Sequence, residues 1–278
     1  MKSPSDTLLV TLVQTNLVWE NPKANLELFE TKINSVKDKM EVVVLPEMFS
    51  TGFSMNPLSL AEEMSGESVK WMRRMAMEKK IILTGSLIIK EEEKYFNRLI
   101  WMQPNGEYFY YDKRHLFAYG GEGDKFSAGS KRLIVSVKGW RLHLMVCYDL
   151  RFPMWARQQR PIEMPDQPKS NKLHEPEYDV LIFAANWPDR RSHAWKTLLQ
   201  ARAIENQCYV IGVNRIGKDG NDIQYAGDSM VVDPMGAVVY TPADRDEIFT
   251  YALTLSDLKQ TRENLPFLRD ADSFLIGH

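Results

Sequence analysis

Short apolar runs alternate along the chain with longer segments whose apolar positions recur every three or four residues. The short runs fit buried strands, and the longer segments fit helices with one buried face. The helical segments begin at Pro22, cover 66–79 and 192–207, and end with a short helix capped by Ser256-Asp257. The predicted strands cover residues 8–13, 42–45, 81–88, 95–102, 108–111, 133–137, 141–146, 180–185, 208–213, 230–232, 237–240 and 248–255.

The connections between these elements predict the architecture. The Asn105-Gly106 pair favours positive backbone angles, so the strands around it are expected to form a hairpin. Other strands are joined through helical segments, which is typical of crossovers. Two sheets packed face to face with helices outside, a layered α/β sandwich, accommodate both kinds of connection.

We expect one domain over residues 1–278. The one unusual stretch, at about 157–177, is polar and contains four prolines. Strand patterns resume on both sides of it, so we interpret it as a surface excursion and not as a linker between domains.

Charge and composition exclude several classes of protein. The net charge is -2, which provides no basic field for nucleic acid or anionic lipid. The apolar run at 8–13 is too short for a signal peptide, and no run approaches a membrane span. Two cysteines are too few for a disulfide scaffold or a Cys/His metal cluster. We therefore expect a cytoplasmic protein without a metal or cofactor.

Polar side chains stand where four predicted strands end. These residues are Glu47, Lys113, Cys147 and Asn186. In open α/β sheets, ligands bind at the carboxyl ends of strands, so a carboxylate, an ammonium, a thiol and an amide are expected to converge on one edge. Taken singly, the cysteine could be a small packed hydrophobe and the charged groups could be solvated. Taken together, they supply a nucleophile, a proton acceptor and a charge stabiliser.

A free thiol has a pKa of about 8.5, so little thiolate exists at neutral pH. Lys113 could lower that pKa, or Glu47 could instead accept the thiol proton as a general base. Cys147 is expected to be the reactive cysteine, whereas Cys208 opens an apolar strand and is expected to pack in the core.

The sequence around these residues resembles the nitrilase superfamily over almost the whole chain. The motifs that carry the resemblance are LPEMF at 45–49, YDKRHLF at 111–117 and CYDLRFP at 147–153. Further similarity lies in NWP at 186–188, QARAIENQ at 200–207 and GDS at 227–229. Within the nucleophile motif, Asp149 and Arg151 are expected to brace the turn that holds the cysteine.

The resemblance implies a four-layer α-β-β-α sandwich that forms a homodimer or a higher homo-oligomer through its helices. It implies that Cys147 attacks an amide carbon to form a thioester. Glu47 would carry protons, while Lys113 and the backbone N–H of Tyr148 would stabilise the oxyanion. Glu122, in a glycine-rich stretch, would be a fourth polar residue that positions the lysine, although it could also be an ordinary turn carboxylate.

Within the superfamily, the chain looks most similar to omega-amidases, an impression strengthened by DADSF at 270–274. Their substrates are small 2-oxo dicarboxylic acid monoamides, hydrolysed with water to the acid and ammonia. Arg191 would bind the substrate carboxylate, although it could be a surface arginine, and Asn186 and Trp187 would line the pocket. Two alternatives remain: an amidase, nitrilase or carbamoyl amidohydrolase for another small substrate, and a catalytically silent binding member of the fold.

Overall fold

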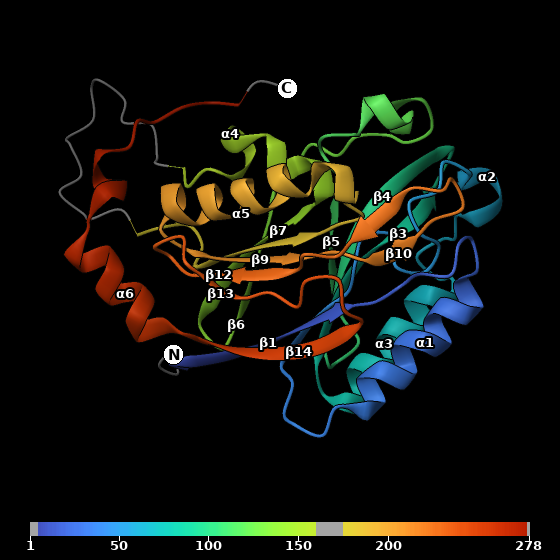
Figure 1. Cartoon of the computed structure of the whole chain (residues 1–278), viewed down its shortest axis with the longest axis horizontal. Helices are drawn as coiled ribbons and strands as arrows, with labels where there is room; N and C mark the ends of the chain where they lie inside the picture. The colour runs from blue at the N-terminus through green and yellow to red at the C-terminus, as the bar shows by residue number, and fades with distance from the viewer. Residues whose placement is uncertain (1–4, 160–174, 277–278) are drawn as a thin grey trace.

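Two six-stranded sheets form the centre of the computed structural model, which describes residues 5–159 and 175–276 (Figure 1). The first sheet has the order β14-β1-β2-β3-β4-β5, and the second has the order β13-β12-β9-β8-β7-β6. The strands of the first sheet are β1 (Thr7–Gln14), β2 (Val42–Val44), β3 (Ile82–Glu91), β4 (Lys94–Met102), β5 (Tyr108–Asp112) and β14 (Glu247–Thr254). Those of the second are β6 (Leu133–Val137), β7 (Trp140–Val146), β8 (Val180–Ala184), β9 (Tyr209–Val213), β12 (Met230–Val232) and β13 (Val238–Tyr240).

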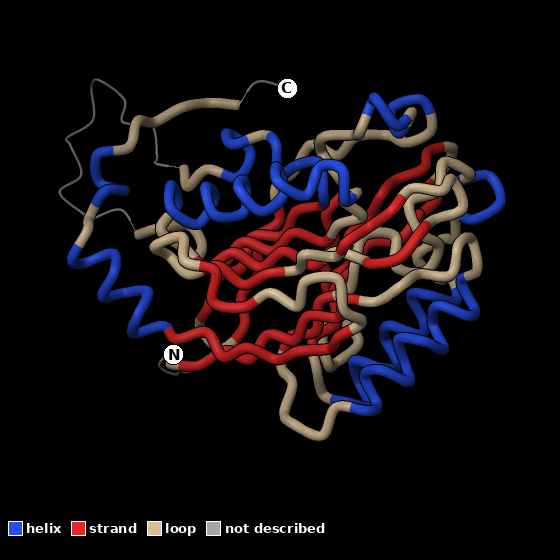
Figure 2. Tube along the Cα trace, in the orientation of Figure 1, coloured by secondary structure: helices blue, strands red, loops and turns tan. Residues whose placement is uncertain are grey.

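Helices cover the outer face of each sheet (Figure 2). On the first sheet lie α1 (Pro22–Ser35) and α3 (Glu67–Lys79); on the second lie α4 (Pro153–Ala156) and α5 (Ser192–Asn206). Two further helices, α2 (Pro57–Leu60) and α6 (Leu255–Asn264), lie at the periphery, and a small hairpin pairs β10 (Ile216–Lys218) with β11 (Gln224–Ala226). The predicted α-β-β-α layering is therefore confirmed.

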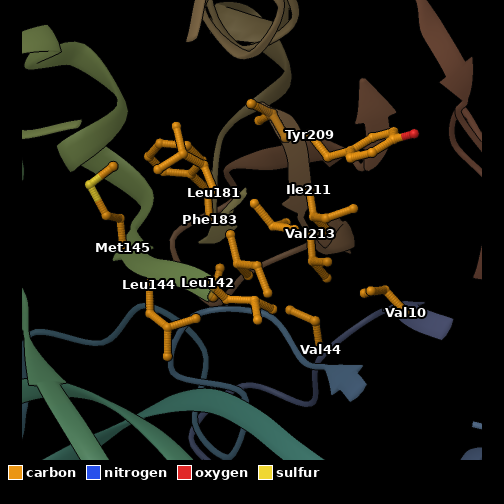
Figure 3. Packing of buried hydrophobic residues seen from close by; sticks show 14 of the residues in the cluster. Val10, Val44, Leu142, Leu144, Met145, Leu181, Phe183, Tyr209, Ile211 and Val213 are labelled. Atoms are coloured by element: carbon orange, nitrogen blue, oxygen red, sulfur yellow. The ribbon is translucent and has the colours of Figure 1, made fainter. Parts of the chain in front are cut away.

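Successive side chains of a strand point to opposite faces of its sheet. The apolar residues are therefore divided between a core that lies between the two sheets and a core that lies under the helices α1 and α3. Val42 and Val44 of β2 face the second sheet, whereas Val43 faces the layer of α1 and α3. Figure 3 shows Leu142 and Leu144 of β7 lying against Val10 and Val44 in the core between the sheets. This core fixes the sheets relative to one another, because side chains from both inner faces interdigitate.

The central strands of each sheet run parallel, which brings their carboxyl ends together. β1, β2 and β3 are parallel neighbours in the first sheet, as are β7, β8 and β9 in the second. Glu47 follows β2 and Cys147 follows β7, so the topology places two of the predicted site residues at strand ends that face each other across the inter-sheet core.

The predicted elements agree with the structure except in a few details. The last helix begins at Leu255, and its N-cap is Thr254 without a side-chain bond, so the predicted cap at Ser256-Asp257 is wrong. Ser256 instead bonds Asp6 through its backbone N–H and its hydroxyl, which ties this helix to the start of the chain. The hairpin of β10 and β11 is absent from the predicted elements, because its two strands are only three residues long.

Most of the predicted excursion at 157–177 lies outside the described residues, which leave out 160–174. The described residues at the two ends of this stretch are bonded to residues beside the second sheet. Gln158 donates from Nε2 to the carbonyl of Tyr178 (2.8 Å), and Glu177 pairs with Arg132. Among the described residues, no helix is long and apolar enough to cross a membrane.

The inter-sheet core supports a stability prediction. Leu144 is fully buried between the sheets. Leu144→Ala therefore removes buried methyl groups and leaves a cavity, which should lower the free energy of unfolding by about 2–5 kcal/mol. Leu58→Ala is the control, because Leu58 is 85% exposed and should change that energy by less than about 0.5 kcal/mol. Equal shifts of the urea unfolding midpoint for both variants would contradict the assignment of this core.

Candidate active site

The predicted site residues meet at the carboxyl ends of the central strands. Lys113 directly follows β5, and its Nζ lies 2.9 Å from Oε1 of Glu47. Glu47 Oε2 accepts a hydrogen bond from the backbone N–H of Asn186 (2.9 Å), and the Cys147 thiol lies 3.8 Å from the Asn186 carbonyl. Segments far apart in the sequence, from both sheets, therefore build one cluster.

The ammonium of Lys113 is enclosed by carboxylates. Besides its bond to Glu47, it lies 3.0 Å from Oε1 and 2.8 Å from Oε2 of Glu122. All three side chains are fully buried. Burial alone would lower the pKa of Lys113, but the charges of Glu122 and Glu47 outweigh that effect and raise the pKa above its ordinary value. The lysine therefore remains an ammonium throughout the neutral range.

Glu122 comes from a short helical turn at Glu122–Asp124, in the loop between β5 and β6, and does not itself end a strand. Its Oε2 accepts the backbone N–H of Phe117 (2.6 Å), which closes the loop over Lys113. Burial raises the pKa of this carboxyl and the charge of Glu47 raises it further, while Lys113 opposes both effects. The structure places Glu122 beside Lys113, as the resemblance implied.

Cys147 lies in a strained turn at the end of β7. Its φ angle is +43°, a left-handed conformation that costs a non-glycine residue roughly 1–3 kcal/mol. It starts the helical turn Cys147–Arg151, so the backbone N–H groups that follow it lack partners within the turn. Such a turn exposes the thiol to the pocket while the strand behind it stays buried.

The environment of the thiol differs from the sequence-based expectation. Burial raises the pKa of Cys147 well above its ordinary value, and the hydrogen-bonded carboxylate of Glu47 adds to the increase. Lys113 acts in the opposite direction but does not prevail. A net lowering by the ammonium, the first of the two routes considered above, is therefore wrong. The thiol stays protonated at rest, and direct transfer of its proton to Glu47 is the route that the geometry favours.

Asp149 connects the turn Cys147–Arg151 to the loop that follows Lys113. Its carboxylate accepts the backbone N–H of Val146 (3.0 Å) and the hydroxyl of Tyr111 (2.8 Å). It also accepts the backbone N–H of His115 (3.0 Å), and the ring nitrogen Nδ1 of His115 lies 2.8 Å away. Asp149 thus braces the turn as predicted. The same prediction for Arg151 is wrong, because its exposed guanidinium lies over the ring of Trp187 at the pocket.

A cavity of about 220 Å³ opens above the thiol. Its walls include the aromatic side chains of Phe53, Phe117 and Trp187. Asn186 also reaches the cavity, but its amide nitrogen is bonded to the carbonyl oxygen of Glu47 (2.5 Å). A substrate would therefore meet an apolar slot with the reactive groups at its floor.

Three guanidiniums surround this cavity: those of Arg151, Arg190 and Arg191. None of them forms an ion pair with a carboxylate of residues 5–159 or 175–276. Burial lowers the pKa of Arg191, and repulsion from Arg190 and Arg151 contributes. Its guanidinium lies 5.1 Å from the centre of the Phe117 ring. Unpaired positive charge beside a small cavity favours an anionic ligand.

Sequence reasoning missed two residues near the reaction centre. Asn97 on β4 donates from Nδ2 to Glu47 (2.8 Å) and to Glu122 (3.0 Å). The available signal was the polar pair Asn97-Arg98 in the middle of a strand that is otherwise mostly apolar. Tyr225 of β11 forms part of the cavity wall and donates to Asp219 (2.9 Å). The hairpin that carries Tyr225 has no clear alternation of apolar and polar residues, so nothing in the sequence indicated that Tyr225 lies at the site. Among the described residues, no group of His, Cys, Asp and Glu side chains is arranged to hold a metal ion.

Comparison with known proteins agrees with this geometry. A family model described as carbon-nitrogen hydrolase matches residues 9–263. The chain is 39% identical to the omega-amidase YafV of Escherichia coli K12, covering 97% of this chain and 98% of the relative. It is 30% identical to the 2-oxoglutaramate amidase of Bacillus subtilis, covering 94% and 96%.

Solved structures show the same fold. The CN-hydrolase superfamily protein XC1258 of Xanthomonas campestris matches with a TM-score of 0.91 and 40% identity, over 98% of this chain and all of that one. Nit3 of Saccharomyces cerevisiae, a member of the nitrilase superfamily, matches with a TM-score of 0.78 and 24% identity over 96% and 97% of the two chains. With the buried Glu47–Lys113 pair beside a cysteine at a strand end, the chain belongs to the carbon–nitrogen hydrolase family of the nitrilase superfamily and is an amidase.

Proposed function

We propose that this protein is an omega-amidase. It hydrolyses the terminal amide of small 2-oxo dicarboxylic acid monoamides, 2-oxoglutaramate and 2-oxosuccinamate, to 2-oxoglutarate or oxaloacetate and ammonia. The observation that carries the proposal is one small cavity with Cys147 and the Lys113 cluster at its floor and unpaired guanidiniums around it. Two relatives with 30–39% identity carry names of this activity.

The first half of the reaction forms a thioester. The Cys147 sulfur attacks the amide carbon while its proton passes to the carboxylate of Glu47, to which the thiol is hydrogen-bonded. Because burial holds the thiol protonated, proton transfer and attack are coupled through that contact. Glu47 then donates the proton to the departing nitrogen as the carbon–nitrogen bond breaks, and ammonia leaves.

The second half of the reaction hydrolyses the thioester. Glu47, ionised again, takes a proton from water, the water oxygen attacks the thioester carbon, and Glu47 returns that proton to the departing sulfur, which restores the thiol and the carboxylate. In both halves the carbonyl oxygen becomes an oxyanion. Lys113 and the backbone N–H of Tyr148 stabilise it, and removal of one such donor typically costs about 10²–10³-fold in rate. Glu122 holds the ammonium in place.

The far end of the substrate carries a carboxylate next to the 2-oxo group. Arg191 is our assigned partner for it, because its guanidinium reaches the cavity without a carboxylate partner among the described residues. Trp187 forms a wall. Asn186, expected as a substrate contact, is proposed to act mainly by fixing Glu47, to which it is bonded through both its backbone N–H and its side chain.

We also propose that the protein works in the cytoplasm as a single-domain homodimer that joins its copies through α4 and α5. Two apolar side chains on these neighbouring helices, Met154 and Ile204, are 50% and 56% exposed. Large exposed apolar side chains on outer helices are compatible with a surface that a partner covers. An isologous contact of this kind would leave the cavity free in each copy.

The dimer surface can be tested with one charge. Ile204→Glu places a carboxylate in the proposed contact, and the buried charge is expected to shift the protein from dimer to monomer in sedimentation velocity experiments. Leu58→Glu, on the exposed helix α2, should leave the sedimentation coefficient unchanged. A wild-type monomer, or a dimer that survives Ile204→Glu intact, would contradict the assigned surface.

The two cysteines provide a matched test of the nucleophile. Cys147→Ala should abolish ammonia release while the circular dichroism spectrum and melting temperature stay close to those of the wild type. Cys208→Ala removes a fully buried thiol from the core and should retain turnover per folded molecule, at the cost of some stability. Measurable turnover in Cys147→Ala, or its loss in folded Cys208→Ala, would overturn the assignment.

The substrate proposal predicts selective ammonia release. 2-Oxoglutaramate should be hydrolysed with the highest kcat/KM in a panel that includes pentanamide, a carbamoyl amino acid and a nitrile. Arg191→Gln should lower kcat/KM for 2-oxoglutaramate by roughly 10–100-fold, since one charge-assisted bond contributes about 1.5–3 kcal/mol. The same variant should change kcat/KM for uncharged pentanamide by much less.

The matched control for charge is Arg74→Gln, which removes an arginine from the exposed face of α3 and should leave both substrates unaffected. Preference for the carbamoyl compound or the nitrile would replace the omega-amidase proposal with the corresponding activity. Equal losses on the charged and uncharged amides in Arg191→Gln would show that Arg191 does not bind the carboxylate.

A further inference from the structure

The hydrogen bonds of Lys113 raise a question about its role at the oxyanion. An ammonium has three N–H donors. In this structure its Nζ contacts three carboxylate oxygens: Oε1 of Glu47, and Oε1 and Oε2 of Glu122. Every donor therefore has an acceptor before any substrate binds. To stabilise an oxyanion, the ammonium must give up one of these bonds.

The free-energy cost of giving up a bond depends on whether another hydrogen-bond donor still contacts the carboxylate oxygen that Lys113 leaves. All of these groups are fully buried, and a buried charged acceptor that loses its donor bears the full cost of its desolvation. That cost would be subtracted from the stabilisation of the oxyanion. The exchange is therefore productive only if a second donor stays on the oxygen that the lysine leaves.

Asn97 supplies that second donor. Its Nδ2 lies 2.8 Å from Oε1 of Glu47 and 3.0 Å from Oε1 of Glu122, the same two oxygens that Lys113 contacts. An amide nitrogen has two hydrogens, one for each carboxylate. Two carboxylate oxygens, the ammonium and the amide thus form a closed ring in which each oxygen has two donors.

The backbone and the other amide atom of Asn97 agree with this interpretation. Its carbonyl accepts the backbone N–H of Lys113 (3.0 Å), so strand β4 positions both donors of the ring from one place. Its side-chain oxygen Oδ1 is buried without a hydrogen-bond partner. An amide that only stabilised the core would satisfy both ends. Here one end is left unpaired while the nitrogen faces two carboxylates.

We propose that Asn97 is a positioning residue that releases one N–H of Lys113 for the oxyanion. When the tetrahedral intermediate forms, the ammonium exchanges a bond to one of the two Oε1 atoms for a bond to the substrate oxygen. The amide of Asn97 remains on that Oε1 atom and keeps the buried carboxylate hydrogen-bonded. When the intermediate collapses, the ammonium returns. No covalent bond to Asn97 forms, and its amide neither gains nor loses a proton.

The proposal rests on the proposed roles of Cys147 and Lys113, and it separates two reactions of the same thiol. Amide hydrolysis passes through an oxyanion. Disulfide formation with methyl methanethiosulfonate does not, because the thiolate attacks sulfur and methanesulfinate leaves. Loss of Asn97 should therefore impair the first reaction and spare the second. Removing a donor from Glu47 also leaves that carboxylate no weaker as an acceptor for the thiol proton.

The test measures both reactions in Asn97→Leu and Asn97→Asp, which keep the size of the side chain and remove the amide donors. Hydrolysis of the best amide substrate should show kcat lowered by about 10–100-fold with KM changed by less than about threefold. The rate of Cys147 modification, followed by peptide mapping, should be unchanged or higher. Thr84→Val, which removes a buried hydroxyl without a partner on the adjacent strand β3, should leave both rates unchanged.

Three outcomes would overturn the proposal. The first is a kcat within threefold of the wild type in both Asn97 variants. The second is a parallel fall of hydrolysis and thiol modification, which would show that Asn97 only maintains the architecture of the site. The third is a change confined to KM. If the wild type prefers an amide other than 2-oxoglutaramate, the substrate proposal fails while this test proceeds unchanged with the preferred amide.

Discussion

The buried ammonium of Lys113 between two carboxylates is the constraint on which the rest of the site depends. Moving such charges out of water costs several kcal/mol per ion unless each is paired and hydrogen-bonded. The structure meets this requirement with groups from both sheets: Asn97 from the first sheet, and the backbone N–H of Asn186 from the end of β8 in the second. The pairing of the strands within each sheet and the inter-sheet core bring these donors to one place.

This cluster also determines how the thiol is activated. A free-standing thiolate would add a further negative charge next to Glu47, and burial together with that carboxylate raises the pKa of Cys147 instead. In the proposed reaction the nucleophile is therefore generated only as the proton moves to Glu47, in the presence of a carbonyl that can take up the developing charge. Catalytic power then depends on preorganised donors rather than on a standing thiolate. The strained φ angle at Cys147 lies within the turn that carries this thiol.

The sequence predicts the site residues that stand at the ends of strands. It does not predict the features of the site that depend only on contacts between side chains in the folded protein. Glu47, Lys113 and Cys147 stand directly after apolar runs, so periodicity and topology place them together. Glu122 is in a glycine-rich loop without a periodic pattern, and only resemblance identified it. Arg151 lies in the same motif as Asp149, yet no pattern encodes which way an exposed guanidinium points. The sign of the Cys147 pKa shift depends on burial and on competing charges, which a one-dimensional pattern does not contain.

The distribution of charge explains how one small cavity can orient its ligand. At the floor, one ammonium is set against two carboxylates, so that end carries no positive excess to attract an anion. At the walls and mouth, three guanidiniums (Arg151, Arg190 and Arg191) stand against one carboxylate, that of Asp219, and none of the three forms an ion pair among the described residues. A substrate with a carboxylate at one end and a neutral amide at the other is therefore drawn in with the amide toward Cys147. In the reverse orientation the ligand carboxylate would leave these guanidiniums and meet an ammonium that two carboxylates already neutralise.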